Sequence, residues 1–278
     1  MQGQVVIVGA GVAGLVLADR LSEAGLRAVL IEVEDGIGGL ARSFRYPNSA
    51  VFDIGPHRFH TDDPRVQAYI EAILGGNVVT IDRNSQLYLF GKYLPWPITL
   101  KNVLALPPPM MARAGLDLLF PRRARTDSFE DYIIANYGRT LYLAFFKPYT
   151  EKFLDYSCSN LHRDWAEAGI NRATIDKQIK TQSLAALVRS VLLAKRPQTK
   201  FLYPRTGGVQ AFCDVLAEKI TARGGRILTG AEVREFVRDK NGPIRAVVAT
   251  SGEEFPADYV FWSGSLEDLR GLGRAPEN

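Results

Sequence analysis

The feature that most constrains the fold is a glycine-rich turn that comes directly after an apolar run. Residues 4–8 read QVVIV, which is typical of a strand buried on both faces of a parallel sheet. The next six residues place glycine in the pattern G-x-G-x-x-G, at Gly9, Gly11 and Gly14. Gly9 permits the tight turn, Gly11 leaves the backbone open to a pyrophosphate, and Gly14 allows strand and helix to pack closely. The pattern is informative only when a helix and an acidic residue follow at the right distance.

Both follow in this chain. Residues 13–24 carry apolar side chains at helical spacing, and Gly25 is expected to end that helix. Residues 27–31 read RAVLI, a second strand pattern, and Glu32 comes eighteen residues after Gly14. The helix N-terminus offers N–H groups to a diphosphate, and the carboxylate can accept hydrogen bonds from an adenosine ribose. The order predicts a dinucleotide-binding fold whose acid disfavours NADP. The alternative is a glycine-rich turn in an unrelated α/β protein.

Composition fits a folded protein of one large or two modest domains. Among 278 residues, 46% are hydrophobic and 23% are charged, and the net charge is +4. The two cysteines, Cys158 and Cys213, form no C-x-x-C pair, which favours a reducing compartment. The first residues show no signal-peptide pattern, and no run of about 18 apolar residues is long enough to span a membrane. We therefore expect a cytoplasmic protein.

The basic residues are scattered along the chain except at one place. Arg122, Arg123 and Arg125 follow the apolar stretch 115–120. A basic end on an apolar helix can rest on an anionic membrane surface, but a solvated loop is the favoured interpretation. Because a nucleic-acid binder gathers its basic residues on one face or in tracts, we expect no nucleic-acid partner.

A second glycine pair follows the acidic residue. Residues 33–44 read VEDGIGGLARSF and contain Gly38, Gly39 and Arg42. A close-approach glycine pair followed by an arginine offers another place to hold phosphates or ribityl oxygens. The same three residues also suit an ordinary surface turn.

These motifs resemble the start of the FAD-dependent amine oxidase and protoporphyrinogen oxidase superfamily. Three later blocks are similar to segments of UDP-galactopyranose mutases: 52–64 (FDIGPHRFHTDDP), 141–152 (LYLAFFKPYTEK) and 201–212 (FLYPRTGGVQAF). The resemblance extends from residue 4 to about residue 262. It implies FAD as the cofactor and a small-molecule substrate. It also implies an α/β fold, in which a Rossmann-like FAD/NAD(P)-binding domain carries an inserted, mainly helical substrate domain.

The resemblance further implies which residues would contact each part of FAD. They are Gly9, Gly11, Ala13 and Gly14 for the pyrophosphate, Glu32 for the adenosine ribose, Gly38, Gly39 and Arg42 for the phosphate and ribityl chain, Gly55, Pro56 and His57 for the isoalloxazine ring, and the backbone of Val233 for the adenine.

Three residues are expected at the substrate: His57 and Tyr149 by matching position, and Arg172 as a match to the diphosphate-binding arginine of the mutases. Where the mutases have tryptophan followed by glycine near the uridine, this chain has Leu154 and Asp155. The change speaks against uridine-nucleotide binding. A metal is not expected, because zinc needs three or four ligands and only His60 accompanies His57.

We expect three segments: residues 1–76 as the first part of the FAD-binding domain, 77–200 as the substrate domain, and 201–278 as the second part. Asp63 and Pro64 predict a helix start, and Gly91 predicts a hairpin between 86–90 and 92–94. Further helices are predicted over 99–106, 109–119, 128–147, 160–171, 182–195 and 208–223, and strands over 226–229, 233–238, 245–250 and 258–262.

The expected reaction is hydride transfer from a small substrate to flavin N5. The first alternative is a UDP-galactopyranose mutase-like isomerisation of a nucleotide sugar on reduced flavin. The second is a truncated, non-catalytic nucleotide-binding scaffold, because the Gly-Asp segment that completes the family's flavin site is not found before Asn278.

Overall fold

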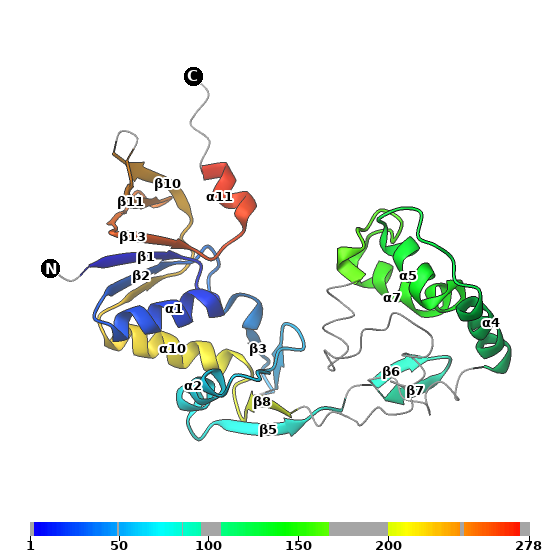
Figure 1. Ribbon diagram of the computed structural model, residues 1–278. Helices are drawn as coiled ribbons and strands as arrows, with labels where there is room; N and C mark the ends of the chain where they lie inside the picture. The colour runs from blue at the N-terminus through cyan, green and yellow to red at the C-terminus, as the bar shows by residue number, and fades with distance from the viewer. Residues whose placement is uncertain are drawn as a thin grey trace. The chain divides into compact units, whose positions relative to one another are not determined.

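The computed structural model describes residues 3–48, 50–84, 86–95, 107–166, 200–239 and 242–272. The chain divides into two compact units (Figure 1). Unit 1 combines Met1–Ile81 with Lys200–Asn278, and unit 2 is Asp82–Thr199. The predicted domain boundaries, at 76/77 and 200/201, stay predictions about which segments bind cofactor and substrate.

A four-stranded parallel sheet forms the centre of unit 1. Its strands lie in the order β13-β1-β2-β9. Every neighbouring pair runs parallel, with Val5 opposite both Ala28 and Tyr259. The bounds are Gln4–Val8 for β1, Arg27–Ile31 for β2, Arg226–Leu228 for β9 and Tyr259–Trp262 for β13. The apolar runs of β1 and β2 thus occupy the buried positions that their composition predicts. The edge strand β13 leaves Tyr259 and Phe261 exposed.

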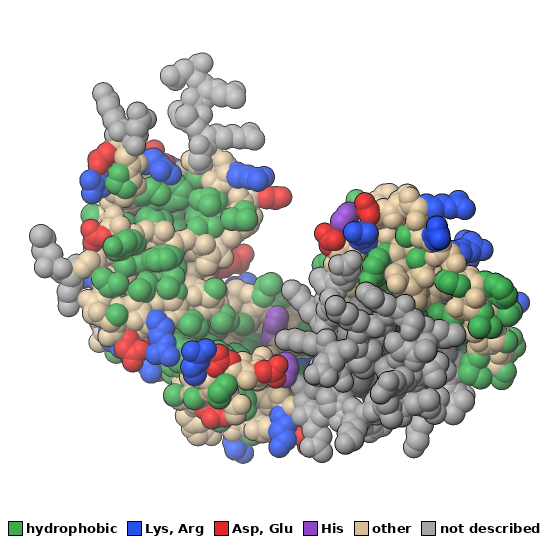
Figure 2. All heavy atoms as spheres, in the orientation of Figure 1, with side chains coloured by type: hydrophobic (Ala, Val, Ile, Leu, Met, Phe, Trp, Pro, Cys, Tyr) green, Lys and Arg blue, Asp and Glu red, His purple; other side chains and the backbone are tan. Residues whose placement is uncertain are grey.

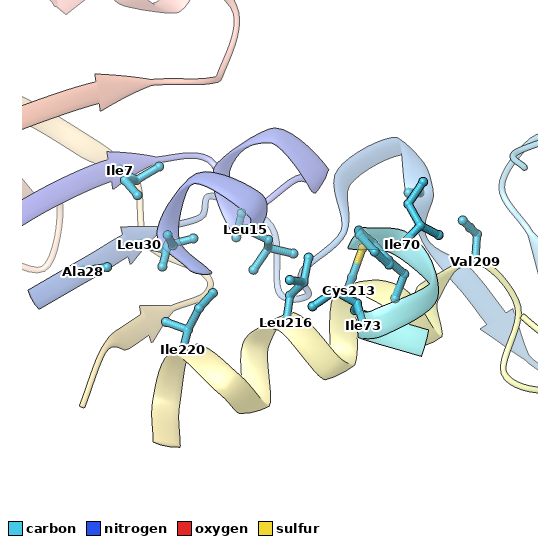
Figure 3. Close-up of a cluster of buried hydrophobic side chains, with 14 of the residues drawn as sticks. Ile7, Leu15, Ala28, Leu30, Ile70, Ile73, Val209, Cys213, Leu216 and Ile220 are labelled. Carbon is cyan, nitrogen blue, oxygen red and sulfur yellow. The ribbon is translucent and has the colours of Figure 1, made fainter. Parts of the chain in front are cut away.

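Alternate residues of these strands enter two different cores. Val5, Ile7 and Leu30 face α1 (Val12–Glu23), α2 (Pro64–Leu74) and α10 (Gln210–Ala222), which lie on one side of the sheet (Figures 1 and 3). Leu15 of α1 and Leu216 and Ile220 of α10 complete this core with no exposed surface. Each such side chain contributes roughly 1.5–3 kcal/mol through burial.

The opposite face of the sheet is covered by strands instead of helices. Val6, Val8 and Val29 point into a second core formed with an antiparallel sheet. That sheet has the order β10-β11-β12, with bounds Val233–Arg238, Ile244–Ala249 and Glu254–Pro256. The helix, parallel-sheet and antiparallel-sheet layers confirm the predicted Rossmann-like α/β fold.

The predicted helix ends of unit 1 are also confirmed. Gly25 follows α1 at φ 85° and Gly75 follows α2 at φ 55°, both in the positive-φ region that glycine tolerates. Asp63 caps α2, where its side chain accepts a 2.8 Å hydrogen bond from the amide of Arg65.

Several short elements of unit 1 were not predicted. They are η1 (Gly39–Ala41), the antiparallel pair β3 (Ser43–Arg45) and β4 (Val51–Asp53), the pair β5 (Val78–Asp82) and β8 (Lys200–Pro204), strand β12, and helix α11 (Leu266–Leu272). At three to five residues, the strands are too short for an alternating pattern to stand out.

Unit 2 contains a hairpin and a helical cluster. The hairpin joins β6 (Gln86–Leu89) to β7 (Lys92–Pro95) through Gly91 at φ 73°, as predicted. The helical elements are α4 (Pro108–Leu119), α5 (Phe129–Tyr137), α6 (Arg139–Leu141), the π-helical turn η2 (Tyr142–Phe146) and α7 (Lys147–Leu154). Phe129, Ile133 and Tyr142 are the largest side chains of their core. No helix in the described ranges of the chain is long and apolar enough to cross a membrane.

The prediction of one helix over 128–147 is wrong. Gly138 interrupts it at φ 84° and ψ 155°, and the chain turns there so that the amide of Thr140 donates to Asp117 at 2.6 Å. The predicted helix over 160–171 is wrong at its start, since His162 forms a β-bridge with Ser128. Its residues 167–171 and the helices predicted over 99–106 and 182–195 lie outside the described residues.

Candidate functional site

The turn after β1 is held in a shape that only glycine allows. Gly9 has φ 99°, and a Cβ there would lie 2.5 Å from Oγ of Ser263. A Cβ on Gly14 would collide with the carbonyl oxygen of Gly9. Gly9 and Gly14 therefore serve the close packing of turn and helix.

Gly11 differs from these two glycines because its missing side chain faces space. The nearest atom to a Cβ placed on it is the Cα of Gly39, at 4.0 Å. Gly11 is also the N-cap of α1, and no side chain of the described part of the chain caps that helix. The first N–H groups of α1 therefore have no side-chain cap among the described residues and lie at an open stretch of backbone, next to the exposed Ala13.

A second glycine turn lies against the first. Gly38 and Gly39 have φ 105° and 55°, and Gly38 forms a parallel bridge with Gly11. The amide of Gly38 donates to the carbonyl of Ala10 at 2.8 Å. Gly11 and Gly38 are twenty-seven residues apart in the chain, and the two glycine segments are therefore one continuous backbone surface.

Glu32 is buried at the base of this surface, with 7% of its area exposed. Oε2 accepts from the amide of Ala10 at 2.7 Å, and Oε1 accepts from the amide of Glu34 at 3.0 Å. Through the bond to Ala10, the carboxylate therefore holds the first glycine turn in place. A carboxylate has about four acceptor positions, so two remain for the hydroxyls of a ribose.

Arg42 supplies the positive charge at the second loop. Its Nε is buried and has no hydrogen-bond partner in the described part of the structure. A terminal nitrogen lies 3.5 Å from a carboxylate oxygen of Glu34, a long contact to a side chain that is mostly exposed. Because a buried donor without an acceptor is costly, an oxygen of a ligand that accepts from this nitrogen would be favourable here.

Asp53 ties the loop before the predicted isoalloxazine contacts to the rest of unit 1. Oδ1 accepts from Oγ of Ser43 at 2.6 Å and from the amide of Val209 at 3.0 Å, and Oδ2 accepts from the hydroxyl of Tyr203 at 2.6 Å. The amide of Ile54 donates to the carbonyl of Arg42 at 2.9 Å. The next residues along the chain are Gly55, Pro56 and His57, so this loop begins beside Arg42.

The hydrogen bonds of Asp53 decide its charge. Burial acts to raise the pKa of this carboxyl, but the bonds from Ser43, Tyr203 and the Val209 amide outweigh burial and lower the pKa below its ordinary value. Burial, together with the hydrogen bond to Asp53, raises the pKa of Tyr203 to about 12. Asp53 is thus an ionised acceptor at neutral pH.

The remaining predicted residues lie in different surroundings. His57 is close to Gly55, where a Cβ would approach its Nε2 to 3.0 Å. Val233 is 5% exposed at the start of β10 and belongs to the second core. Tyr149 lies in unit 2, 56% exposed, stacked on Phe145 and Phe153 with ring centroids 5.8 and 6.2 Å apart. Arg172 lies outside the described residues.

Sequence reasoning missed the residues that hold the loops in place. Gln210 at the start of α10 donates to the carbonyl of Ile37 at 3.3 Å, and Ser263 donates to the carbonyl of Val8 at 2.9 Å. Gly208 has φ 68°, and a Cβ there would meet Ser43 and Asp53. The pair Gly207-Gly208 was the one available signal for this junction.

Taken together, the residues of unit 1 fit a dinucleotide diphosphate. They offer a bare backbone surface at Gly11 and Gly39, an uncapped helix N-terminus, a carboxylate with free acceptor positions, and a buried guanidinium nitrogen that lacks an acceptor. Among the described residues, no group of three or more His, Cys, Asp or Glu side chains is arranged to hold a metal.

The chain is similar to known proteins. The sequence profile of a family described as flavin-containing amine oxidoreductases matches residues 12–273. A Klebsiella pneumoniae protein described as a probable UDP-galactopyranose mutase is 29% identical over 163 residues, covering 53% of this chain and 40% of that protein. The 15-cis-phytoene desaturase of Synechococcus elongatus is 22% identical over 278 residues, covering 90% of this chain and 55% of the desaturase.

A comparison with solved structures finds a similar fold. The crystal structure of a reduced UDP-galactopyranose mutase superimposes with a TM-score of 0.79 and 21% identity, covering 99% of this chain and 58% of the other. At that identity the likeness concerns the fold alone. The chain spans about half the length of the relatives that it matches.

Proposed function

The chain belongs to the flavin-containing amine oxidoreductase family, and from this premise we propose that it is an FAD-dependent oxidoreductase that takes hydride from a small substrate. FAD is the cofactor of this family. The observation that carries the proposal is the buried Nε of Arg42, which lacks an acceptor beside two joined glycine turns. A phosphate oxygen satisfies that donor.

The roles of individual residues follow from their surroundings. The N-terminus of α1 and the bare backbone of Gly11 bind the diphosphate. Glu32 binds the adenosine ribose with the acceptor positions that Ala10 and Glu34 leave free. Arg42 neutralises phosphate charge. When bound, the flavin supplies the redox chemistry, and the protein orients it.

The resemblance of residues 52–64 to flavoproteins supports His57 as the residue that handles protons near the flavin, and its surroundings are compatible with that role. Asp53 is four residues away, but both of its oxygens accept hydrogen bonds and its pKa is lowered. Asp53 is therefore a poor general base, and its hydrogen bonds hold the loop in place. His57 follows Gly55 and Pro56 in a loop that Asp53 fixes, and it is partly exposed, so a substrate can reach it.

A second candidate function is the mutase-type isomerisation of a nucleotide sugar. The similarity to the Klebsiella protein over 53% of the chain favours it. At the departure from the mutases, Leu154 and Asp155, the backbone of Asp155 has φ 50°, a left-handed conformation that glycine adopts readily. The backbone there suits the family's glycine, whereas Leu154 cannot replace an indole ring.

The first experiment identifies the cofactor. The purified protein is expected to be yellow, with a flavin absorbance spectrum, and to release FAD in about equal amount when it is denatured. If the released nucleotide is NAD, or if the apoprotein takes up no FAD, the proposed function is wrong. The scaffold alternative predicts FAD uptake without turnover of any substrate.

The second experiment separates the two reactions. The flavin absorbance of an oxidoreductase of this type decreases when its substrate is added under anaerobic conditions. An amine and a polyene are the substrates to try first. A mutase is active only after dithionite reduction and binds UDP. If millimolar UDP changes neither the flavin spectrum nor the melting temperature, the mutase candidate fails.

A further inference from the structure

The outward face of α4 is apolar although water reaches it. Residues 109, 112, 116, 119 and 120 follow the spacing of one helix face, and all are exposed. The three large side chains among them are Leu116, Leu119 and Phe120, with 55%, 63% and 75% of their area exposed. An exposed apolar stripe of this kind usually marks an interaction surface.

The contacts of the other side chains of α4 show which way the apolar stripe faces. Ala114 is buried, and the carboxylate of Asp117 accepts the amide of Thr140 at 2.6 Å beside Gly138. Asp117 therefore points toward α5 and α6, and the apolar stripe points away from them. Figure 2 shows hydrophobic side chains over the part of unit 2 where α4 lies in Figure 1.

Four arginines accompany the stripe: Arg113, Arg122, Arg123 and Arg125, all exposed. The only acid in residues 112–126 is Asp117, which faces inward. None of the ion pairs in the described part of the chain uses these four guanidinium groups.

The acids that follow along the chain are already engaged. Asp127 pairs with Arg163 at 3.2 Å. The carboxylate of Asp131 accepts hydrogen bonds from the backbone of Arg125 and from Thr126. The four positive charges next to the apolar stripe are therefore only partly balanced by their surroundings.

We propose that α4 and residues 120–125 dock on an anionic lipid surface. Leu116, Leu119 and Phe120 enter the boundary between headgroups and acyl chains, and the arginines pair with lipid phosphates. A second copy of the chain is disfavoured as the occupant, because a two-fold contact would bring the arginines of one face against those of the other. The proposal for this surface does not rest on the proposed flavin site in unit 1.

The test is flotation of the full-length chain with vesicles of phosphatidylcholine, with and without phosphatidylglycerol. Two variants probe the surface: the double change Leu119→Ser and Phe120→Ser, and the triple change Arg122→Gln, Arg123→Gln and Arg125→Gln. Matched controls are Leu143→Ser, an exposed leucine elsewhere in unit 2, and the triple change Arg234→Gln, Arg238→Gln and Arg270→Gln in unit 1.

The wild-type chain is expected to float only with the anionic vesicles, and added salt weakens this binding. The arginine variant loses roughly fivefold in partitioning per arginine, on the order of a hundredfold in all. The serine variant loses at least about tenfold. Both controls bind as the wild type does.

Four results would overturn the proposal. The wild-type chain could fail to bind anionic vesicles, or it could bind neutral and anionic vesicles equally. The surface variants could bind as well as their controls. Sedimentation could instead show a dimer that the serine variant converts to a monomer, without vesicle binding by the wild type. In that case a second copy covers α4.

Discussion

The three glycines of the first turn belong to one motif, but each has a different structural role. Gly9 is needed for its positive φ, Gly14 for its contact with the Gly9 carbonyl, and Gly11 for the space above it. Only the last of these leaves the protein itself unaffected when a methyl group is added. Substitution at single residues can therefore separate cofactor binding from folding.

We expect Gly11→Ala to fold and to lose FAD. Its backbone has φ −71°, which alanine adopts freely, and a Cβ there has no neighbour closer than 4.0 Å. The free energy of unfolding of the apoprotein should change by less than about 1 kcal/mol, the usual difference between these residues at an N-cap. The flavin content of the purified protein should fall at least tenfold, because the methyl group occupies the place of the diphosphate.

Gly14→Ala is the matched control. Its methyl group would collide with the carbonyl of Gly9, so this variant should unfold at lower temperature with or without FAD. Melting curves of the two apoproteins, with their absorbance at the flavin band, make the comparison. Equal flavin content in Gly11→Ala and the wild type would remove Gly11 from the site.

Arg42→Met tests the unpartnered nitrogen. Methionine removes a buried donor that has no acceptor and a long contact to Glu34, so the stability of the apoprotein should change by less than about 1 kcal/mol. Affinity for FAD should fall by roughly 10- to 100-fold, the usual worth of a hydrogen bond to a charged group.

Titration of the apoprotein with FAD, followed by flavin fluorescence, measures this loss. Arg45→Met, three residues along the chain and exposed, is the control and should bind FAD normally. If Arg42→Met binds as tightly as Arg45→Met, the buried guanidinium does not serve the phosphate.

At the scale of elements, Asp53 joins the β3–β4 pair to β8 and to the start of α10. Its pKa is lower in the folded chain than in the unfolded chain. The stability that it adds is therefore present above the unfolded pKa of about 3.9 and is lost as pH falls through the folded pKa. The unfolding of the wild type should become easier below about pH 4 for this reason.

Asp53→Asn should cost roughly 1–3 kcal/mol at neutral pH, because one hydrogen-bond acceptor becomes a donor that faces the hydroxyl of Tyr203. The difference in unfolding free energy from the wild type should shrink between about pH 5 and pH 2. Urea unfolding across this range measures it, and Asp62→Asn, an exposed neighbour, is the control. A constant difference at every pH would show that the charge of Asp53 adds nothing.

The break at Gly138 also belongs to this scale. Gly138→Ala would place a methyl group at φ 84° and 2.5 Å from the Cβ of Asp117, and should destabilise unit 2 by roughly 1–3 kcal/mol or more. Gly115→Ala lies inside α4 with no atom near its Cβ and should stabilise by about 0.5–1 kcal/mol. Urea unfolding of both variants compares them, and a shift of the same sign in both would contradict this account.

The sequence predicted the elements whose signals are local. The β1 run, the turn glycines and the Asp63-Pro64 helix start are each decided by neighbouring residues, and each is found in the structure. The break at Gly138 is decided by a contact with Asp117, twenty-one residues away, and apolar spacing continues across it. A single glycine in an otherwise helical pattern does not reveal such a contact.

The candidate site shows the same division. Gly9, Gly14 and Glu32 could be assigned from one motif, because strand, turn and helix are consecutive in the chain. The pairing of Gly38 with Gly11 and the bonds of Asp53 to Tyr203 and Val209 join segments that only the folded chain brings together. No periodicity in the sequence encodes these tertiary contacts.

At the scale of the whole molecule, the two units have separate cores. Unit 1 buries both faces of its parallel sheet, and the described core of unit 2 is smaller, with Phe129, Ile133 and Tyr142 as its largest members. Stability in the two units should therefore differ, and a ligand that binds one unit should act on that unit first.

Scanning calorimetry of the apoprotein should accordingly show two transitions, with unit 2 unfolding at the lower temperature. FAD at about a hundredfold above its dissociation constant adds about 2.7 kcal/mol to the unit that binds it, enough to raise a melting temperature by several degrees. The upper transition should shift and the lower one should stay. In Gly11→Ala neither should move, which assigns the shifted transition to unit 1. One transition that shifts as a whole would mean that the units unfold together, and a shift confined to the lower transition would place FAD outside the glycine turns of unit 1.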